Sequence, residues 1–422
     1  MIRFASLVLL IGHFYFCSVA LGQDDNAYKF DFSYTYGTLQ LLPCLVANAG
    51  HDFDEDKNYS DIWIHGDINI SDKLSYAGSA EITDQPHQLI NTKYSRPDYP
   101  LSTGRIQRSA FKYSHNDFSL IVGRDDMLGS HLRPQIFIYP TYGDGFSWSY
   151  KTHGWGAKHV FQVLPAEKGN GQVFRRSISY HHLAKDFHNF TLGVGEYFIL
   201  TGENIEFDLK RLNPFLPYAL NSHDSEADNF PGYVGDTDNS LIKLFIDWRK
   251  KSSQLSLSLY VDEFQIDAAD RAIKNDALLL NLSVFNDLEV FGVNSRIIWG
   301  FSVGNTNFGQ HPGPFTTTTI GMYPLFEYTP GMKDLVFIES NTSLGKTWQF
   351  TIAGYSERWV NISELLPSQM NQRADLEELK IHSDSRLLFG VEYRLEQYPI
   401  RFKVSGWSGN SPGMCLKTQL GF

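Results

Sequence analysis

The side chains that usually act as nucleophiles or metal ligands do not form a recognisable catalytic arrangement in this sequence. No serine or histidine stands in an esterase or protease context, and no H-E-x-x-H zinc motif occurs. In the one histidine pair, His181-His182, the neighbours would point to opposite faces of a strand, so the two rings cannot share a metal ion. We therefore expect no enzyme, no metal site and no cofactor.

Aromatic rings beside an acidic residue form a more suggestive set. Tyr142 and Trp148 flank Asp144 and its two neighbouring glycines. Such rings can stack on a sugar while the carboxylate accepts hydrogen bonds from its hydroxyl groups. The same rings would also suit the aromatic girdle at the surface of a membrane barrel, and both interpretations stay open at this point.

The elements that must position these residues are strands with alternating faces. Lys29–Gly37, Leu387–Leu395, Ile400–Ser408 and Gly413–Phe422 each place apolar residues at every second position. Alternation of this kind sends one set of side chains to each face of a strand. The last segment ends on an aromatic residue, as the final strand of outer-membrane barrels does, and we expect it to pair with Ile400–Ser408 and Lys29–Gly37.

Connections of two kinds alternate along the chain. The predicted short turns are Ser71–Lys73, His115–Asp117, Lys250–Ser253, Asn286–Asp287 and Gln397–Pro399. The predicted long segments are Ile82–Ile106, Asp125–Asp144, Thr201–Asn239, Gln265–Asp276, Val303–Thr318 and Arg358–Ser385. This asymmetry predicts an all-β transmembrane antiparallel barrel of about 16 to 18 strands, with 18 favoured, short periplasmic turns and long extracellular loops. A soluble β-sandwich is the alternative.

Composition and the N-terminus agree with export to the outer membrane. Residues 1–22 have the pattern of a cleavable signal peptide, which leaves 23–422 as a single barrel domain. Aromatic residues make up 14% of the chain, and the net charge of −11 argues against nucleic acid as a partner. Cys44 and Cys415 would remain after cleavage, either as a disulfide or as two free thiols.

The central region resembles the Wzi family of capsule-assembly outer-membrane proteins. The motifs that carry the resemblance are Gly123-Arg124-Asp125, Gly202-Glu203-Asn204, Asn213-Pro214-Phe215, Asp238-Asn239-Ser240-Leu241 and the segment Tyr260–Ile266. The resemblance implies a barrel that anchors exported polysaccharide in a lectin-like manner. The candidate ligand-binding residues, in loops and at the rim, are Arg124, Asp125, Tyr142, Asp144, Trp148, Glu203, Asp238, Asn239, Asp262 and Glu263.

Two functions follow as expectations. The first is binding of capsular or extracellular polysaccharide at the cell surface, with outer-membrane lipid and the barrel-assembly machinery as further partners. The alternative is a general or sugar-selective porin, because charged residues such as Arg401 and Lys403 alternate with apolar ones and would face a polar lumen.

Overall fold

The structure is a computed structural model of the chain, and part of the sequence is described in it. The described residues are 28–38, 58–83, 103–128, 143–169, 172–202, 238–263, 277–290, 292–304, 319–320, 323–324, 332–360, 380–395, 400–408 and 413–421. The predicted signal peptide, Cys44 and Phe422 lie outside these ranges. Within them, no helix is long and apolar enough to cross a membrane.

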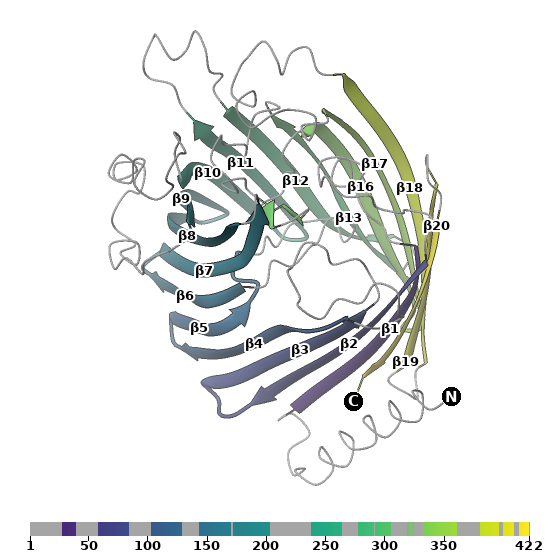
Figure 1. Cartoon of the computed structure of the whole chain (residues 1–422). Helices are drawn as coiled ribbons and strands as arrows, with labels where there is room; N and C mark the ends of the chain where they lie inside the picture. Colours follow the sequence, from purple (N-terminus) through teal and green to yellow (C-terminus); the bar gives the residue numbers. More distant parts are fainter. Residues whose placement is uncertain are drawn as a thin grey trace.

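Eighteen antiparallel strands form one closed barrel, which confirms the predicted fold class and the favoured strand number (Figure 1). The first nine strands are β1 (Tyr28–Thr38), β2 (Asn58–Asn69), β3 (Leu74–Thr83), β4 (Thr103–His115), β5 (Phe118–Asp125), β6 (Gly143–Thr152), β7 (Trp155–Gly169), β8 (Gln172–Phe187) and β9 (Phe190–Gly202). The other nine are β10 (Asp238–Lys250), β11 (Ser253–Glu263), β12 (Ala277–Val290), β13 (Val293–Gly304), β16 (Met332–Leu344), β17 (Trp348–Val360), β18 (Ile381–Arg394), β19 (Ile400–Ser408) and β20 (Gly413–Gly421). The two-residue strands β14 (Thr319–Ile320) and β15 (Tyr323–Pro324) pair only with each other.

The last strand closes the barrel with the partners that the sequence predicts. β20 pairs with β19, where Leu416 lies opposite Val404, and with β1, where Leu420 lies opposite Phe32. In Figure 1, β1 (purple) and β20 (yellow) lie side by side at this seam.

Strand alternation separates an apolar outer face from a mixed inner face. In β18, Leu387 and Phe389 are more than 60% exposed, whereas Arg386 and Leu388, which alternate with them, are buried. The same alternation leaves Ile352, Ile338 and other large apolar residues exposed on the outer face of neighbouring strands. An exposed apolar belt around a closed barrel is the surface that lipid requires.

One rim of the barrel carries short turns, in agreement with the sequence prediction. Two-residue connections join β6 to β7 and β8 to β9, and successive turns are linked by backbone hydrogen bonds such as Asp186 N to Gly154 O at 2.7 Å. His153 and Gly154 both have positive φ, which a tight two-residue hairpin of this kind requires. The N-terminus of β1 and the C-terminus of β20 lie at this rim.

One predicted turn is wrong. Asn286 and Asp287 lie inside β12, and the chain reverses after Val290, which lies opposite Val293. Asn and Asp favour turns, but here Asp287 points to the interior and forms an ion pair with Arg296 of β13. At the opposite rim most connections are long, for example residues 203–237, although β7 and β8 are separated by residues 170–171 alone.

Candidate functional site

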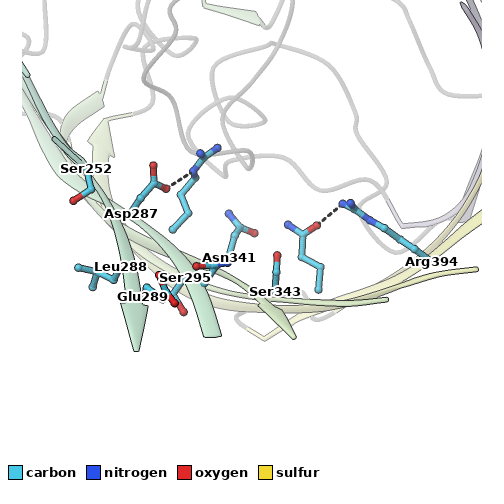
Figure 2. Close-up of a pocket in the computed structure, with 11 residues that line it drawn as sticks. Ser252, Asp287, Leu288, Glu289, Ser295, Asn341, Ser343 and Arg394 are labelled. Carbon is cyan, nitrogen blue, oxygen red and sulfur yellow. Dashed lines mark hydrogen bonds and ion pairs between the residues drawn. The ribbon is translucent and has the colours of Figure 1, made fainter. Parts of the chain in front are cut away.

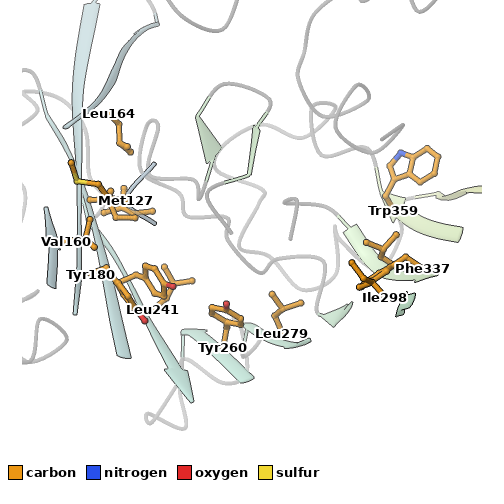
Figure 3. Close-up of a cluster of buried hydrophobic side chains, with 14 residues drawn as sticks. Met127, Val160, Leu164, Tyr180, Leu241, Tyr260, Leu279, Ile298, Phe337 and Trp359 are labelled. Atoms are coloured by element: carbon orange, nitrogen blue, oxygen red, sulfur yellow. The ribbon is translucent and has the colours of Figure 1, made fainter. Parts of the chain in front are cut away.

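The interior of the barrel is the only extended concave surface that the described strands enclose, and its wall has two zones. The zone nearer the long connections is an apolar set, named here the inner apolar band. Its members are Met127, Val160, Leu164, Ile178, Tyr180, Tyr197, Ile199, Leu241, Tyr260, Leu279, Ile298, Leu335, Phe337 and Trp359. They follow the wall in an arc in Figure 3, and each is at most 7% exposed. The side chains of this band are therefore not accessible to solvent.

Stacked aromatic rings on β8 to β11 form the border of the band that lies nearer the short turns. The rings of Tyr180 and Tyr197 stack with centroids 4.1 Å apart, and Tyr260 follows at 6.4 Å from Tyr197. Tyr180 Oη and His182 Nδ1 share a hydrogen bond of 2.8 Å. Lys243 Nζ lies 5.0 Å from the centroid of the Tyr260 ring, at cation–π distance. The three rings are thus buried in the band, and Lys243 places a positive charge beside them.

The other side of the interior, on β2 to β5, carries an ion pair and two buried carboxyl groups that accept hydrogen bonds from uncharged side chains. Arg108 of β4 holds Asp125 of β5, with 2.8 Å between Arg108 Nε and Asp125 Oδ1. Gln107 donates to the buried carboxylate of Glu81, and Trp63 Nε1 donates to Asp61. Buried polar groups of this kind are stable only when they are paired or hydrogen-bonded, so these contacts fix the side chains on the wall.

The zone nearer the short turns is polar and accessible, and is named here the short-turn vestibule. It consists of inward-facing side chains close to the short-turn ends of their strands: Asp67, Lys112, Asp287, Arg296, Arg394 and Arg401. Four of the six groups are positive and two are negative. The vestibule thus offers hydrogen-bonding groups of both signs to a solute that enters from this rim.

A pocket of about 730 Å³ opens into the vestibule between β11 and β18 (Figure 2). On one side of it, Arg296 Nε donates to Asp287 Oδ1 at 2.9 Å, and its guanidinium lies 4.7 Å from the centroid of the Phe285 ring. On the other side, Arg394 donates to Gln349 Oε1 and to Glu392 Oε1, both at 2.8 Å. Two anchored arginines therefore face one volume large enough for a small organic molecule.

A buried polar network lies between the pocket and the band. Asn341 lines the pocket, donates to Glu339 and accepts a hydrogen bond of 2.7 Å from the Thr351 hydroxyl. Glu339 is fully buried. The network joins β16 to β17 at the level where the accessible zone ends.

The predicted residues Arg124, Asp144 and Trp148 lie on the outer face and not in the interior. They share that face with Val122, which is 48% exposed. Arg124 Nε donates to Asp144 Oδ1 at 3.0 Å, so each side chain provides a hydrogen-bonding partner for the other. The Trp148 ring contacts His159 on the neighbouring strand, as a girdle residue would. Asp125 alone of this group points inward, to Arg108.

The other predicted residues lie at strand ends or outside the described residues. β10 begins at Asp238 and Asn239, and β11 ends at Asp262 and Glu263, at the rim of the long connections. The structure places these four positions on neighbouring strands, because Ile242 lies opposite Val261. Tyr142 and Glu203 are outside the described part of the chain. The adjacent histidines diverge as predicted, with His182 inward and His181 outward beside Glu196.

One serine motif among the described residues has the residue types, but not the geometry, of a nucleophile. Gly300-Phe301-Ser302-Val303-Gly304 has the residue types of a nucleophile motif, but it lies within the continuous strand β13 and Ser302 is buried. That motif needs a sharp strand-to-helix turn to expose the serine. No group of three or more His, Cys, Asp or Glu in the described ranges could hold a metal ion.

Comparison with solved structures gives outer-membrane proteins. OccK5 (OpdH) of Pseudomonas aeruginosa aligns with a TM-score of 0.50 and 8% identity, over 94% of this chain and 97% of that one. OprD of the same organism aligns at 0.48 with 9% identity over 94% and 95%, and the OmpT loop-deletion mutant of Vibrio cholerae at 0.39 with 8% over 94% and 98%. No protein-family model and no curated protein matches the sequence. The chain has the fold of an outer-membrane barrel.

The resemblance to the Wzi family is wrong. The match to OccK5 (OpdH) is to a protein other than a Wzi protein, and no family model matches the sequence. The described motifs that carried the resemblance lie at the ends of β5, β9, β10 and β11. Short polar motifs at strand ends are what any barrel needs where strands give way to loops, so they do not discriminate between barrel families.

Proposed function

We propose that the protein is a pore of the porin class, through which small polar solutes cross the outer membrane. The observation that carries the proposal is the short-turn vestibule with its pocket, where Arg296 and Arg394 face an accessible volume inside a closed barrel. The described charged groups of the vestibule, among them Arg296, Asp287 and Arg394, line the lumen, where a passing solute would meet them.

The inner apolar band predicts that the pore is narrow. Eighteen strands enclose a lumen wide enough for an aqueous channel when it is empty. Here the inward side chains in the half nearer the long connections are buried, which reduces the open cross-section. We therefore expect a small conductance and selection by size and polarity, rather than free diffusion of any solute.

Conductance in a planar lipid bilayer tests the proposal. We expect discrete current steps from the purified full-length barrel, and faster swelling of loaded liposomes in small sugars or amino acids than in oligosaccharides. Comparison of uncharged sugars with charged amino acids separates a general pore from a selective one. Barrels that are folded, as judged by heat-dependent mobility in SDS gels, but pass neither ions nor solutes would refute the proposal.

A vestibule variant links the current to the site. Arg394→Gln removes a positive charge from the pocket wall, and we expect the ratio of cation to anion permeability to rise by roughly twofold, since focused charge in a pore governs ion selection. Arg358→Gln is the matched control, because Arg358 pairs with Asp334 on the outer face. An equal change in both variants would mean that the current does not pass the pocket.

A further inference from the structure

Three lysines and two histidines lie at three neighbouring turns of the short-turn rim. The turns join β6 to β7, β8 to β9 and β10 to β11, and they are contiguous because β7 pairs with β8 and β9 with β10. The residues named here the basic crescent are Lys185, Lys250 and Lys251, with His153 and His188 between them. All five are at least partly exposed.

The rest of the described rim has no such excess. The β2–β3 turn carries Asp72 and Lys73, which cancel, and the β4–β5 turn carries Asp117. The β12–β13 end carries Asp287 and Glu289, with Arg296 paired to Asp287, and the β16–β17 turn carries the single lysine Lys346. Among the described turns, a group of three lysines is thus found in the sector of the crescent.

Strand alternation sends Lys185 and Lys250 outward, whereas Lys151 and Arg249 point inward together with the carboxylates of the sector. Lys185 points outward, where its Nζ lies 4.9 Å from the centroid of the Trp155 ring, and donates to His153 O at 3.0 Å. Asp186, the next residue, points inward and accepts a hydrogen bond from Thr191. Asp247 also points inward and accepts one from Ser256. The carboxylates therefore face the lumen, while the ammonium groups of Lys185 and Lys250 face the membrane side.

A belt of aromatic rings lies directly beside the crescent on the outer face. The belt consists of Tyr150, Trp155, Phe187, Phe190 and Trp248. Phe187 and Phe190 stack with centroids 5.2 Å apart, and both are more than 40% exposed. Aromatic rings at this height mark the boundary between hydrocarbon and head groups.

The crescent is held in a fixed shape by the backbone. Asp186 N donates to Gly154 O at 2.7 Å, and Arg249 N donates to Asn189 O at 2.7 Å, so each turn is tied to the next. The positive groups are thus presented at set positions above the aromatic belt. A ligand that fits both features needs an anionic head and an apolar body.

We propose that the basic crescent and the aromatic belt bind an anionic glycerophospholipid from the leaflet that meets the short-turn rim. The phosphate lies among Lys185, Lys250 and Lys251, and the acyl chains lie against the aromatic belt. Lysines beside a membrane surface attract anionic lipids, and their aliphatic stems extend along apolar rings while the charge stays at the head groups. An acidic soluble protein would satisfy the lysines but leave the belt unused.

Lipid retention in native mass spectrometry tests the proposal. The full-length barrel is incubated in detergent with equal amounts of phosphatidylglycerol and phosphatidylcholine, and the bound lipids are counted. We expect phosphatidylglycerol to be retained roughly tenfold better, with the preference falling at high salt because the attraction is electrostatic. Equal retention of the two lipids would overturn the proposal.

Three substitutions assign the preference to the crescent. Lys185→Gln, Lys250→Gln and Lys251→Asn together remove the three charges. Asparagine is used at position 251 because the φ of Lys251 is 51°, a left-handed backbone angle that asparagine tolerates well. Because Lys185 also bonds the turn backbone, a second variant changes Lys250 and Lys251 alone and should lose a smaller part of the preference. Lys73→Gln with Lys346→Gln is the control in other turns.

The outcomes are distinct. The crescent variants should lose the preference, while the control pair keeps it and all variants keep their heat-dependent gel mobility and single-channel conductance. The same loss in the control pair, or binding of an acidic protein without any preference for phosphatidylglycerol, would overturn the proposal. Failure here leaves the proposed pore function untouched, since conductance is measured separately.

Discussion

The two zones of the inner wall differ although they are built from the same strands. In β13, Ile298 of the inner apolar band is 6% exposed, while the side chain of Arg296, two positions nearer the short-turn rim, is 56% exposed. Both point inward, so the face of the strand does not decide their surroundings. The distance from the short-turn rim decides whether an inward side chain is buried or exposed. The position of a residue along the barrel axis therefore matters as much as the face of the strand on which it lies.

The largest expected effect comes from a cavity in the inner apolar band. Leu241→Ala should lower the free energy of unfolding by about 2–5 kcal/mol, since Leu241 is fully buried and the space cannot be refilled. Leu244→Ala, on the lipid-facing side of the same strand, should cost about 1–2 kcal/mol, because lipid chains fill the gap.

Both values come from urea titration of the barrel in detergent, followed by gel mobility and tryptophan fluorescence. Equal losses for Leu241→Ala and Leu244→Ala would show that the band is no better packed than the lipid-facing surface. The difference between the two zones would then be one of accessibility alone.

A medium effect is expected at the border between the zones. Asn341→Leu removes the amide that donates to Glu339 and accepts from Thr351, and should cost about 1–3 kcal/mol of unfolding free energy. Ser343→Ala, which also lines the pocket, is the comparison and should change stability little. If Asn341→Leu leaves the free energy of unfolding unchanged, the polar network is not the feature that separates the two zones.

The smallest effect on stability is expected within the vestibule. Arg296→Gln breaks the pair with Asp287, but an ion pair this exposed contributes only about 0–1 kcal/mol. The same titration should therefore give a curve close to that of the unmodified protein. A loss comparable to that of Leu241→Ala would mean that the vestibule is part of the packed structure and not a solvated chamber.

The fold was predictable because its signals are local. Alternation over nine or so residues, as in Ile400–Ser408, depends only on the period of a strand, and β20 could be placed because a closed barrel must join its ends. The divergence of His181 and His182 followed from the same period. The false turn at Asn286–Asp287 shows the limit, since an inward ion pair uses the residues that also favour turns.

The site was not predictable in the same way. Arg124 and Asp144 share the lipid-facing side of their strands with Val122 and Phe146. The spacing of two residues between Val122 and Arg124 would have excluded Arg124 and Asp144 from a lumenal or glycan site. The inner apolar band was hidden because Leu278, Leu279 and Leu280 are apolar on both faces of β12, so alternation vanishes there. Pairing of Arg296 with Asp287 depends on the register between two strands, which one sequence does not give.

The seam between β1 and β20 has a consequence for the order of biogenesis. The contacts that complete the cylinder, such as Leu420 opposite Phe32, join the opposite ends of the chain, so the loop that they close spans nearly the whole polypeptide. Until β20 arrives, β1 and β19 each present a row of unpaired N–H and C=O groups, which hydrocarbon cannot satisfy. A chain interrupted after Ser408 would therefore hold two adhesive edges, able to recruit strands from other molecules in place of the missing one.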